Sequence, residues 1–191
     1  MHVMLALLNH YNFKPEFEIK DEEGFHNLFK RLSAHLRVTS GLDRVGVVVD
    51  ADDSIQSRWQ SIKAILQKAG YSDIPVDPDP TGTVIDHEYL PRVGVWIMPD
   101  NSLPGMLEDY LRYLVPEGDP LFSRAIRAVD EIPLEERGFT ERHRSKALIH
   151  TWLAWQDDPG TPLGLAITKK YLIADTPHVA VLLSWLNRVF A

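Results

Sequence analysis

Residues 45–49 have the sequence VGVVV, an unbroken apolar run that ends at the acidic residue Asp50. A run of this length is typical of a central parallel strand that is covered on both faces. Residues 55–69 then carry apolar side chains three and four positions apart, as an amphipathic helix does, and Gly70 provides a C-terminal stop. The sequence therefore predicts a strand–helix unit of an α/β fold.

The rest of the chain adds one further buried strand and several helices. Residues 93–98, VGVWIM, form a second apolar run, residues 17–20 favour a short strand, and the proline-rich segment 75–82 predicts a loop. Periodic apolar stripes predict helices at 3–11, 25–36, 106–114, 119–131, 147–155, 163–172 and 179–190. We expect an α/β domain over residues 1–115 and a helical extension over residues 116–191 packed on it, as a single compact unit.

Composition excludes several classes of protein. The chain has 191 residues, which is enough to bury one hydrophobic core without stabilising cross-links. It has no cysteine, so disulfides, thiolate nucleophiles and Cys-ligated metals are excluded. It has no apolar stretch of membrane-spanning length and no basic leader, which predicts a soluble cytoplasmic protein without a membrane partner. Glycine-rich phosphate loops, dinucleotide fingerprints and nucleophile elbows are also absent from the sequence.

The formal net charge of −7 is concentrated in one part of the chain. Residues 50–109 contain eleven acidic and four basic residues, whereas the remainder has sixteen of each and is neutral. A globally acidic protein does not attract polyanions by its net charge. A local acidic cluster can hold divalent cations, and these can in turn bind a phosphate.

The first candidate site is the D-x-D sequence that follows the apolar run. In an extended segment the side chains of Asp50 and Asp52 point the same way, so two carboxylates would converge beyond the carboxyl end of a strand. Together with Asp53 they are hard oxygen ligands suited to Mg²⁺ or Mn²⁺. The alternative is that Asp53 or Ser54 caps the following helix.

Two further clusters could contribute to such a site. Asp100, Glu108 and Asp109 follow the second apolar run, although Glu108 also stands four residues before Arg112, the spacing of a surface ion pair on a helix. A basic cluster could neutralise a phosphoryl group, or could be no more than a solvated helix face. Its members are Arg142, His143, Arg144, Lys146 and His150, of which His143, Lys146 and His150 share one helical face.

Several segments together carry a family resemblance. The strand VGVVVDADD is similar to the D-x-D signature of Toprim domains, which occur in topoisomerases, primases and OLD-family nucleases. The chain as a whole resembles a family of short prokaryotic Toprim-related proteins of unknown function. This second resemblance rests on three segments in order: VVVDADDSIQSRWQSI, VGVWIMPDNSLPGMLEDYL and HRSKALIHTWLAWQ.

The resemblance implies a Toprim-like, Rossmann-like fold, with a mostly parallel sheet flanked by helices and a helical C-terminal extension. It also implies a site that binds Mg²⁺ or Mn²⁺, with Asp50 and Asp52 as ligands and with Asp53 and Asp100 in the same acidic set. Glu108 and Lys146 occupy positions comparable to the acidic residue and lysine that complete the site in OLD-like nucleases. The first Toprim strand and its glutamate have no counterpart in this sequence, so we expect the sheet to lack that strand.

Three functions stay open at this point. The first is a metal-dependent phosphodiester hydrolase that binds DNA or RNA through a metal-bound phosphate. The second is a non-catalytic regulatory or partner-binding module, in which Trp152, Trp155 and Trp185 either pack against a partner or a second copy in a homodimer, or belong to the core. The third is a haloacid-dehalogenase-like phosphatase, with Asp50 as nucleophile and Asp52 as general acid/base.

Overall fold

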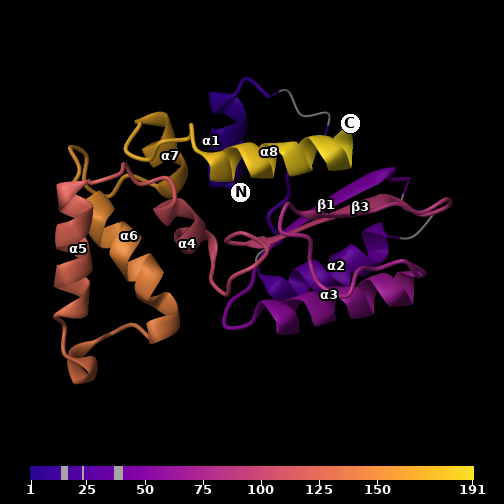
Figure 1. Cartoon of the computed structure of the whole chain (residues 1–191), viewed down its shortest axis with the longest axis horizontal. Coiled ribbons are helices and arrows are strands. Elements are labelled where there is room, and N and C mark those ends of the chain that lie inside the picture. The colour runs from indigo at the N-terminus through magenta and orange to yellow at the C-terminus, as the bar shows by residue number, and fades with distance from the viewer. Residues whose placement is uncertain (14–16, 23, 37–40) are drawn as a thin grey trace. The chain divides into compact units, whose positions relative to one another are not determined.

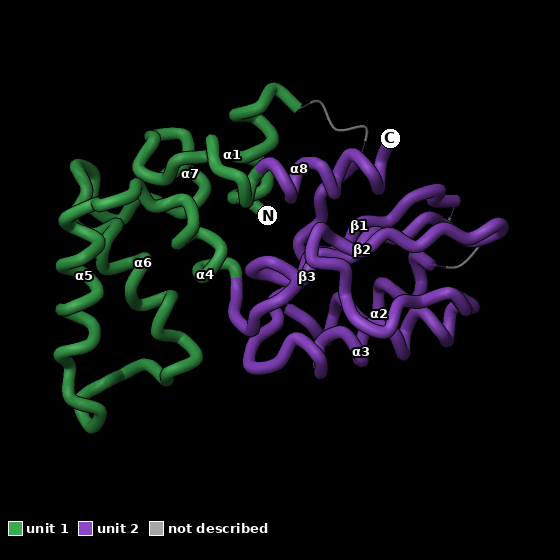
Figure 2. Tube along the Cα trace, viewed as in Figure 1, with its two compact units in different colours: residues 1–15, 107–179 green, residues 16–106, 180–191 purple. Residues whose placement is uncertain are grey.

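The computed structural model describes residues 1–13, 17–22, 24–36 and 41–191. The chain divides into two compact units, each formed from segments distant in sequence (Figure 2). Unit 1 comprises residues 1–15 and 107–179, and unit 2 comprises residues 16–106 and 180–191. The units therefore divide the chain at positions other than the boundary expected near residue 115.

Unit 2 contains a three-stranded sheet in the order β1-β3-β2. Strands β1 (Arg44–Asp50) and β3 (Arg92–Met98) are parallel, with Arg44 opposite Arg92 and Asp50 opposite Met98. Strand β2 (Thr83–Ile85) pairs antiparallel with β3, with Thr83 opposite Val95. The carboxyl ends of β1 and β3 consequently lie together at one edge of the sheet.

The sheet differs from expectation in three respects. It is mixed rather than mostly parallel, because residues 86–91 between β2 and β3 are too few for a parallel crossover of about a dozen or more residues. Among the described strands, the run at 45–49 lies at the edge of the sheet rather than in its centre. The expected strand at 17–20 does not form, since its residues make no ladder with the described strands, and Phe17 instead stacks on Phe190.

Helices cover both faces of this sheet. Helices α2 (Phe25–His35) and α3 (Ile55–Ala69) pack on one face, where the side chains of Val47 and Val49 join a core with Trp59 (Figure 1). Residues 180–190 of α8 (Pro177–Phe190) cover the other face. Unit 2 is therefore a three-layer α/β/α arrangement with its larger core beneath α2 and α3.

Two glycines on neighbouring strands allow α8 to approach the sheet closely. Gly46 and Gly94 are register partners on β1 and β3. A Cβ at Gly46 would lie 3.0 Å from Phe190 Cζ, and one at Gly94 would lie 3.1 Å from Trp185 Cζ2. The bare backbone at these positions therefore accommodates the side chains of α8.

Unit 1 is helical, as the sequence predicts for most of its residues. Its elements are α1 (His2–His10), α4 (Leu107–Arg112), α5 (Pro120–Asp130), the short 3₁₀ helices η2 (Leu134–Glu136) and η3 (Glu141–His143), α6 (Arg144–Ala154), α7 (Leu163–Thr168) and the first turn of α8. Helix α1 packs against α7, where a Cβ at Gly164 would lie 2.8 Å from the carbonyl oxygen of His2. Trp152 lies in the unit 1 core, whereas Trp155 is 41% exposed.

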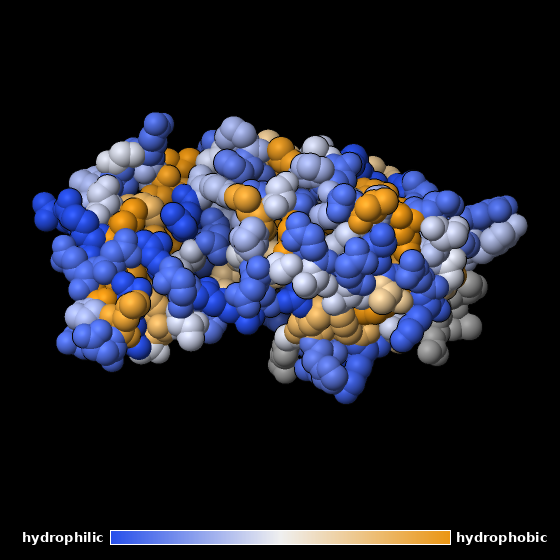
Figure 3. All heavy atoms as spheres, turned by 60° about the horizontal axis from the view of Figure 1, so that its bottom comes forward, coloured by the Kyte–Doolittle hydropathy of each residue, from blue (hydrophilic) through white to orange (hydrophobic). Residues whose placement is uncertain are grey.

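On the face drawn in Figure 3, hydrophilic residues predominate and apolar side chains form separate patches. Trp185, in unit 2, is fully buried and donates from Nε1 to the carbonyl oxygen of Thr83 at 3.1 Å. No helix within the described residues is both long enough and apolar enough to cross a membrane.

Candidate functional site

The candidate site lies where β1 and β3 of unit 2 end. Beyond β1, the amide of Ala51 donates to the carbonyl oxygen of Met98 at 3.1 Å. Asp52 and Gly105 then exchange both backbone hydrogen bonds at 2.8 Å, as an isolated antiparallel bridge. The acidic segment after β1 is therefore tied to the loop after β3 by main-chain bonds.

The chain turns at Asp52 rather than continuing as a strand. Asp52 has a φ of 56°, in the left-handed region, and the bridge places it opposite Gly105, whose φ is 140°. Aspartate tolerates this conformation better than most residues. Because the backbone is not extended here, Asp50 and Asp52 do not follow the alternation on which their expected convergence was based.

An arginine that the sequence analysis missed binds the second aspartate of the D-x-D sequence. Asp52 Oδ2 forms an ion pair with Arg58 Nη2, and both side chains are largely buried. The Arg58 guanidinium carbon also lies 3.4 Å from the ring centroid of Phe25 on α2, a cation–π arrangement. The signal in the sequence was a lone basic residue on the first turns of the predicted helix, just after three acids.

The capping alternative is confirmed for one residue. Ser54 is the N-cap of α3, and its Oγ accepts from the amide of Ser57 at 3.2 Å. Asp53 is exposed and is not the cap. The N-cap role therefore belongs to Ser54 and not to the acid that precedes it.

The loop after β3 has its own internal bonds. Asp100 Oδ1 accepts from the amides of Ser102 and Leu103 at 3.0 and 2.9 Å. Asn101 is buried with a φ of 61°, and its Oδ1 accepts from the amide of Ile97 at 2.7 Å. Asn101 is a second residue that the sequence analysis did not single out, and it fixes the course of this loop.

The donor chemistry beyond β1 fits a divalent cation, although its geometry is not that of an assembled site. Asp50, Asp52 and Asp53 supply hard carboxylate oxygens, and Mg²⁺ is usually bound by one or two carboxylates together with water and substrate phosphate. Within the described residues, no three His, Asp or Glu side chains are grouped as a metal site would need. Asp52 is already paired with Arg58.

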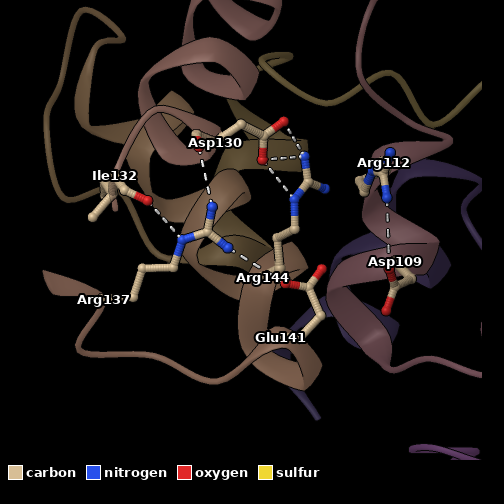
Figure 4. Close-up of polar contacts among 7 residues, drawn as sticks. All are labelled: Asp109, Arg112, Asp130, Ile132, Arg137, Glu141 and Arg144. Carbon is tan, nitrogen blue, oxygen red and sulfur yellow. Dashed lines mark hydrogen bonds and ion pairs between the residues drawn. The ribbon is translucent and has the colours of Figure 1, made fainter. Parts of the chain in front are cut away.

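Glu108 and Lys146, the other predicted site residues, pair with each other in unit 1. Glu108 on α4 is buried, and its Oε1 lies 3.5 Å from Nζ of the exposed Lys146 on α6. The alternative to a functional role for Glu108 was a surface ion pair with Arg112; among the described residues Arg112 pairs instead with Asp109, at 3.7 Å (Figure 4).

Asp109 links the same two helices. Its Oδ1 accepts from Ser145 Oγ, and Ser145 is buried at the start of α6. The contacts of Glu108 and Asp109 therefore fasten α4 to α6 through two neighbouring polar pairs. The tyrosine that follows them, Tyr110, is buried, and burial raises its pKa.

The predicted basic cluster is partly neutralised by its own surroundings. Arg144 donates from Nε and Nη2 to the two carboxylate oxygens of Asp130, at 2.8 and 2.7 Å (Figure 4). His143 lies in η3, before α6 begins, whereas Lys146 and His150 are exposed on α6. Arg144 therefore has a structural role in holding α6 to the end of α5.

One comparison with known proteins gives a match. The family described as a protein of unknown function, DUF3226, matches residues 1–191, and the chain belongs to this family. No curated protein and no solved structure matches it.

Proposed function

We propose that this chain, a member of the DUF3226 family, is a Toprim-type phosphodiester hydrolase or phosphoryl-transfer protein that acts on nucleic acid with Mg²⁺ or Mn²⁺. One observation carries the proposal. The parallel strands β1 and β3 end in register, and the acidic segments after them are joined by the Asp52–Gly105 bridge. Ligands of open α/β sheets bind beyond the carboxyl ends of such strands.

The residues of unit 2 would act chiefly by binding and orienting. Asp50 and Asp52 would be the ligands, with Asp53 and Asp100 adding negative charge nearby. When bound, the cation would orient a phosphate and stabilise the charge that develops on it. Without a cation, the carboxylates repel a phosphate, so binding of nucleic acid should depend steeply on metal.

Arg58 would regulate access to Asp52. Its guanidinium neutralises this carboxylate in the structure, so a cation must compete with an ion pair that is shielded from solvent. Glu108 and Lys146 pair with each other in unit 1, so the residues proposed to act in this site are those of unit 2.

Nicking of supercoiled plasmid in the presence of Mn²⁺ tests the proposal. The variant Asp50→Asn/Asp52→Asn should lose nicking activity, whereas the matched variant Asp73→Asn/Asp77→Asn, which removes the same charge from exposed positions in unit 2, should retain it. Equal nicking by wild type and the Asp50/Asp52 variant would contradict the site assignment.

A second function, a non-catalytic partner-binding module, is favoured by the Asp52–Arg58 pair. An aspartate whose charge is balanced by a buried arginine needs no metal to relieve repulsion within the D-x-D sequence. Titration calorimetry with Mn²⁺ distinguishes the two functions. Heat that disappears in the Asp50/Asp52 variant supports the metal-dependent enzyme, and no heat at millimolar Mn²⁺ supports the binding module.

A further inference from the structure

The outer edge of β1 carries main-chain groups of Gly46 and Val48 that no ladder with a described strand uses. β1 is the terminal strand of the sheet, and its one neighbour among the described strands is β3. At the two ends of β1, the carbonyl oxygen of Asp43 and the amide of Ala51 bond to β3. Because main-chain groups alternate sides along a strand, odd-numbered residues face β3 and the even-numbered Gly46 and Val48 face outward.

This edge lacks the features that usually protect one. It has no proline, no lysine and no bulge along Arg44–Asp50. Val48 is 37% exposed, and Gly46 is exposed as well. A regular seven-residue strand with an apolar centre and outward-facing amides is a template for pairing with another strand.

The sequence of β1 is complementary to itself in the antiparallel direction. If two copies pair with Val47 opposite Val47, Arg44 of each stands opposite Asp50 of the other, and Gly46 stands opposite Val48. The outward-facing Gly46 and Val48 then form hydrogen-bonded pairs of an antiparallel ladder, and the inward-facing Val47 lies at a non-hydrogen-bonded pair. Parallel pairing in register would instead set Arg44 beside Arg44.

We propose that β1 is a dimer interface, through which two copies of this chain join their sheets by antiparallel pairing centred on Val47. The opposite charges at the two ends of the strand fix both the direction and the register. The interface is isologous, so it closes after two copies.

Sedimentation at increasing protein concentration, in the presence of a chelator, tests the interface without reference to any activity. The wild-type mass should rise from 21.8 kDa towards twice that value. Val48→Lys should remain at the monomer mass where wild type is dimeric. The matched control Val181→Lys, at a valine of the same 37% exposure on α8, should dimerise like wild type.

The register has a separate test, because the chain has no cysteine. In Val47→Cys, the two thiols of the proposed dimer lie at a non-hydrogen-bonded pair, with Cα atoms about 4.5 Å apart, within disulfide range. Oxidation of Val47→Cys should give a covalent dimer. In a separate test of the charges, Arg44→Asp should abolish dimerisation and Arg44→Asp/Asp50→Arg should restore it. The proposal is overturned if wild type stays monomeric up to about 1 mM. It is also overturned if Val48→Lys and Val181→Lys weaken association equally. A wild type that dimerises, combined with an oxidised Val47→Cys variant that gives no covalent dimer, would overturn the register.

Discussion

Asp52 and Arg58 form an ion pair across the turn that joins β1 to α3, and the same guanidinium stacks on the ring of Phe25. The pair connects three elements of unit 2: the end of β1, the first turns of α3 and the start of α2. It therefore has two consequences, one for the stability of this unit and one for the affinity of the candidate site for cations.

Replacing Arg58 separates these two consequences. Arg58→Gln removes the cation that competes for Asp52, so Mn²⁺ should bind more tightly than to wild type, by calorimetry. The same change should lower the free energy of unfolding by about 2 kcal/mol, because a partly buried carboxylate loses its partner. Lys20→Gln, at an exposed lysine paired with the exposed Glu18, is the control and should change neither quantity measurably. Weaker Mn²⁺ binding by Arg58→Gln would show that Arg58 does not compete with the metal.

The cap of α3 gives a prediction that is independent of function. Ser54→Ala removes the acceptor for the Ser57 amide and should lower the free energy of unfolding by about 1 kcal/mol. The control is Ser61→Ala in the same helix, where the hydroxyl donates a hydrogen bond to the carbonyl oxygen of Ser57, one turn earlier. Since alanine is the better helix former, Ser61→Ala should be neutral or stabilising in a denaturant titration. An equal loss in both variants would contradict the capping role.

Local signals in the sequence predicted the parts of the fold that depend on neighbouring residues. Ser54 could be proposed as a cap because the acidic turn and the apolar spacing of α3 surround it. The edge position of β1 could not be predicted, because Val47 and Val49 are buried by helices on one face, and burial of this kind does not reveal how many strands flank a strand. Strand β2 was missed because three residues are too few for an alternating pattern.

The candidate site was predictable to a similar extent. The acids after β1 and β3 could be placed at one edge of a sheet, since parallel strands end together. The Asp52–Arg58 pair was not predicted because the left-handed turn at Asp52, which reverses the chain direction, depends on the bridge to Gly105. That bridge joins two loops more than fifty residues apart in sequence, and no local pattern indicates it.

Close packing of α8 on the sheet predicts a strong effect at Gly94. Gly94→Ala places a Cβ against Val189 and 3.1 Å from Trp185 Cζ2, and should lower the free energy of unfolding by about 1–3 kcal/mol. Val189→Ala makes room, so a double-mutant cycle should show a favourable coupling between the two alanines. The control is Gly138→Ala, where nothing lies within 4 Å of the new Cβ, and this variant should be within about 0.5 kcal/mol of wild type. Additive effects of Gly94→Ala and Val189→Ala would contradict the contact.

A buried tyrosine predicts how stability changes at alkaline pH. Tyr71, two residues after the end of α3, is buried and donates from its hydroxyl to the carbonyl oxygen of Pro91 at 2.6 Å, and burial raises its pKa to about 12. In the unfolded chain the phenol ionises at its ordinary pKa of about 10. The stabilisation of the folded state by the raised pKa of Tyr71 is thus complete below pH 10. It is lost as the pH rises from about 10 through about 12, because the unfolded state releases the proton first.

Tyr71→Phe isolates this contribution. The variant has no phenol to ionise, so its Tm should fall less steeply than that of wild type between pH 10 and pH 12. Below pH 10 it should be less stable by about 1 kcal/mol, since the Pro91 carbonyl loses its donor. Tyr89→Phe, at a tyrosine that is 72% exposed, should follow the wild-type curve throughout. Parallel Tm curves for wild type and Tyr71→Phe above pH 10 would mean that the Tyr71 phenol ionises as readily in the folded chain as in the unfolded one.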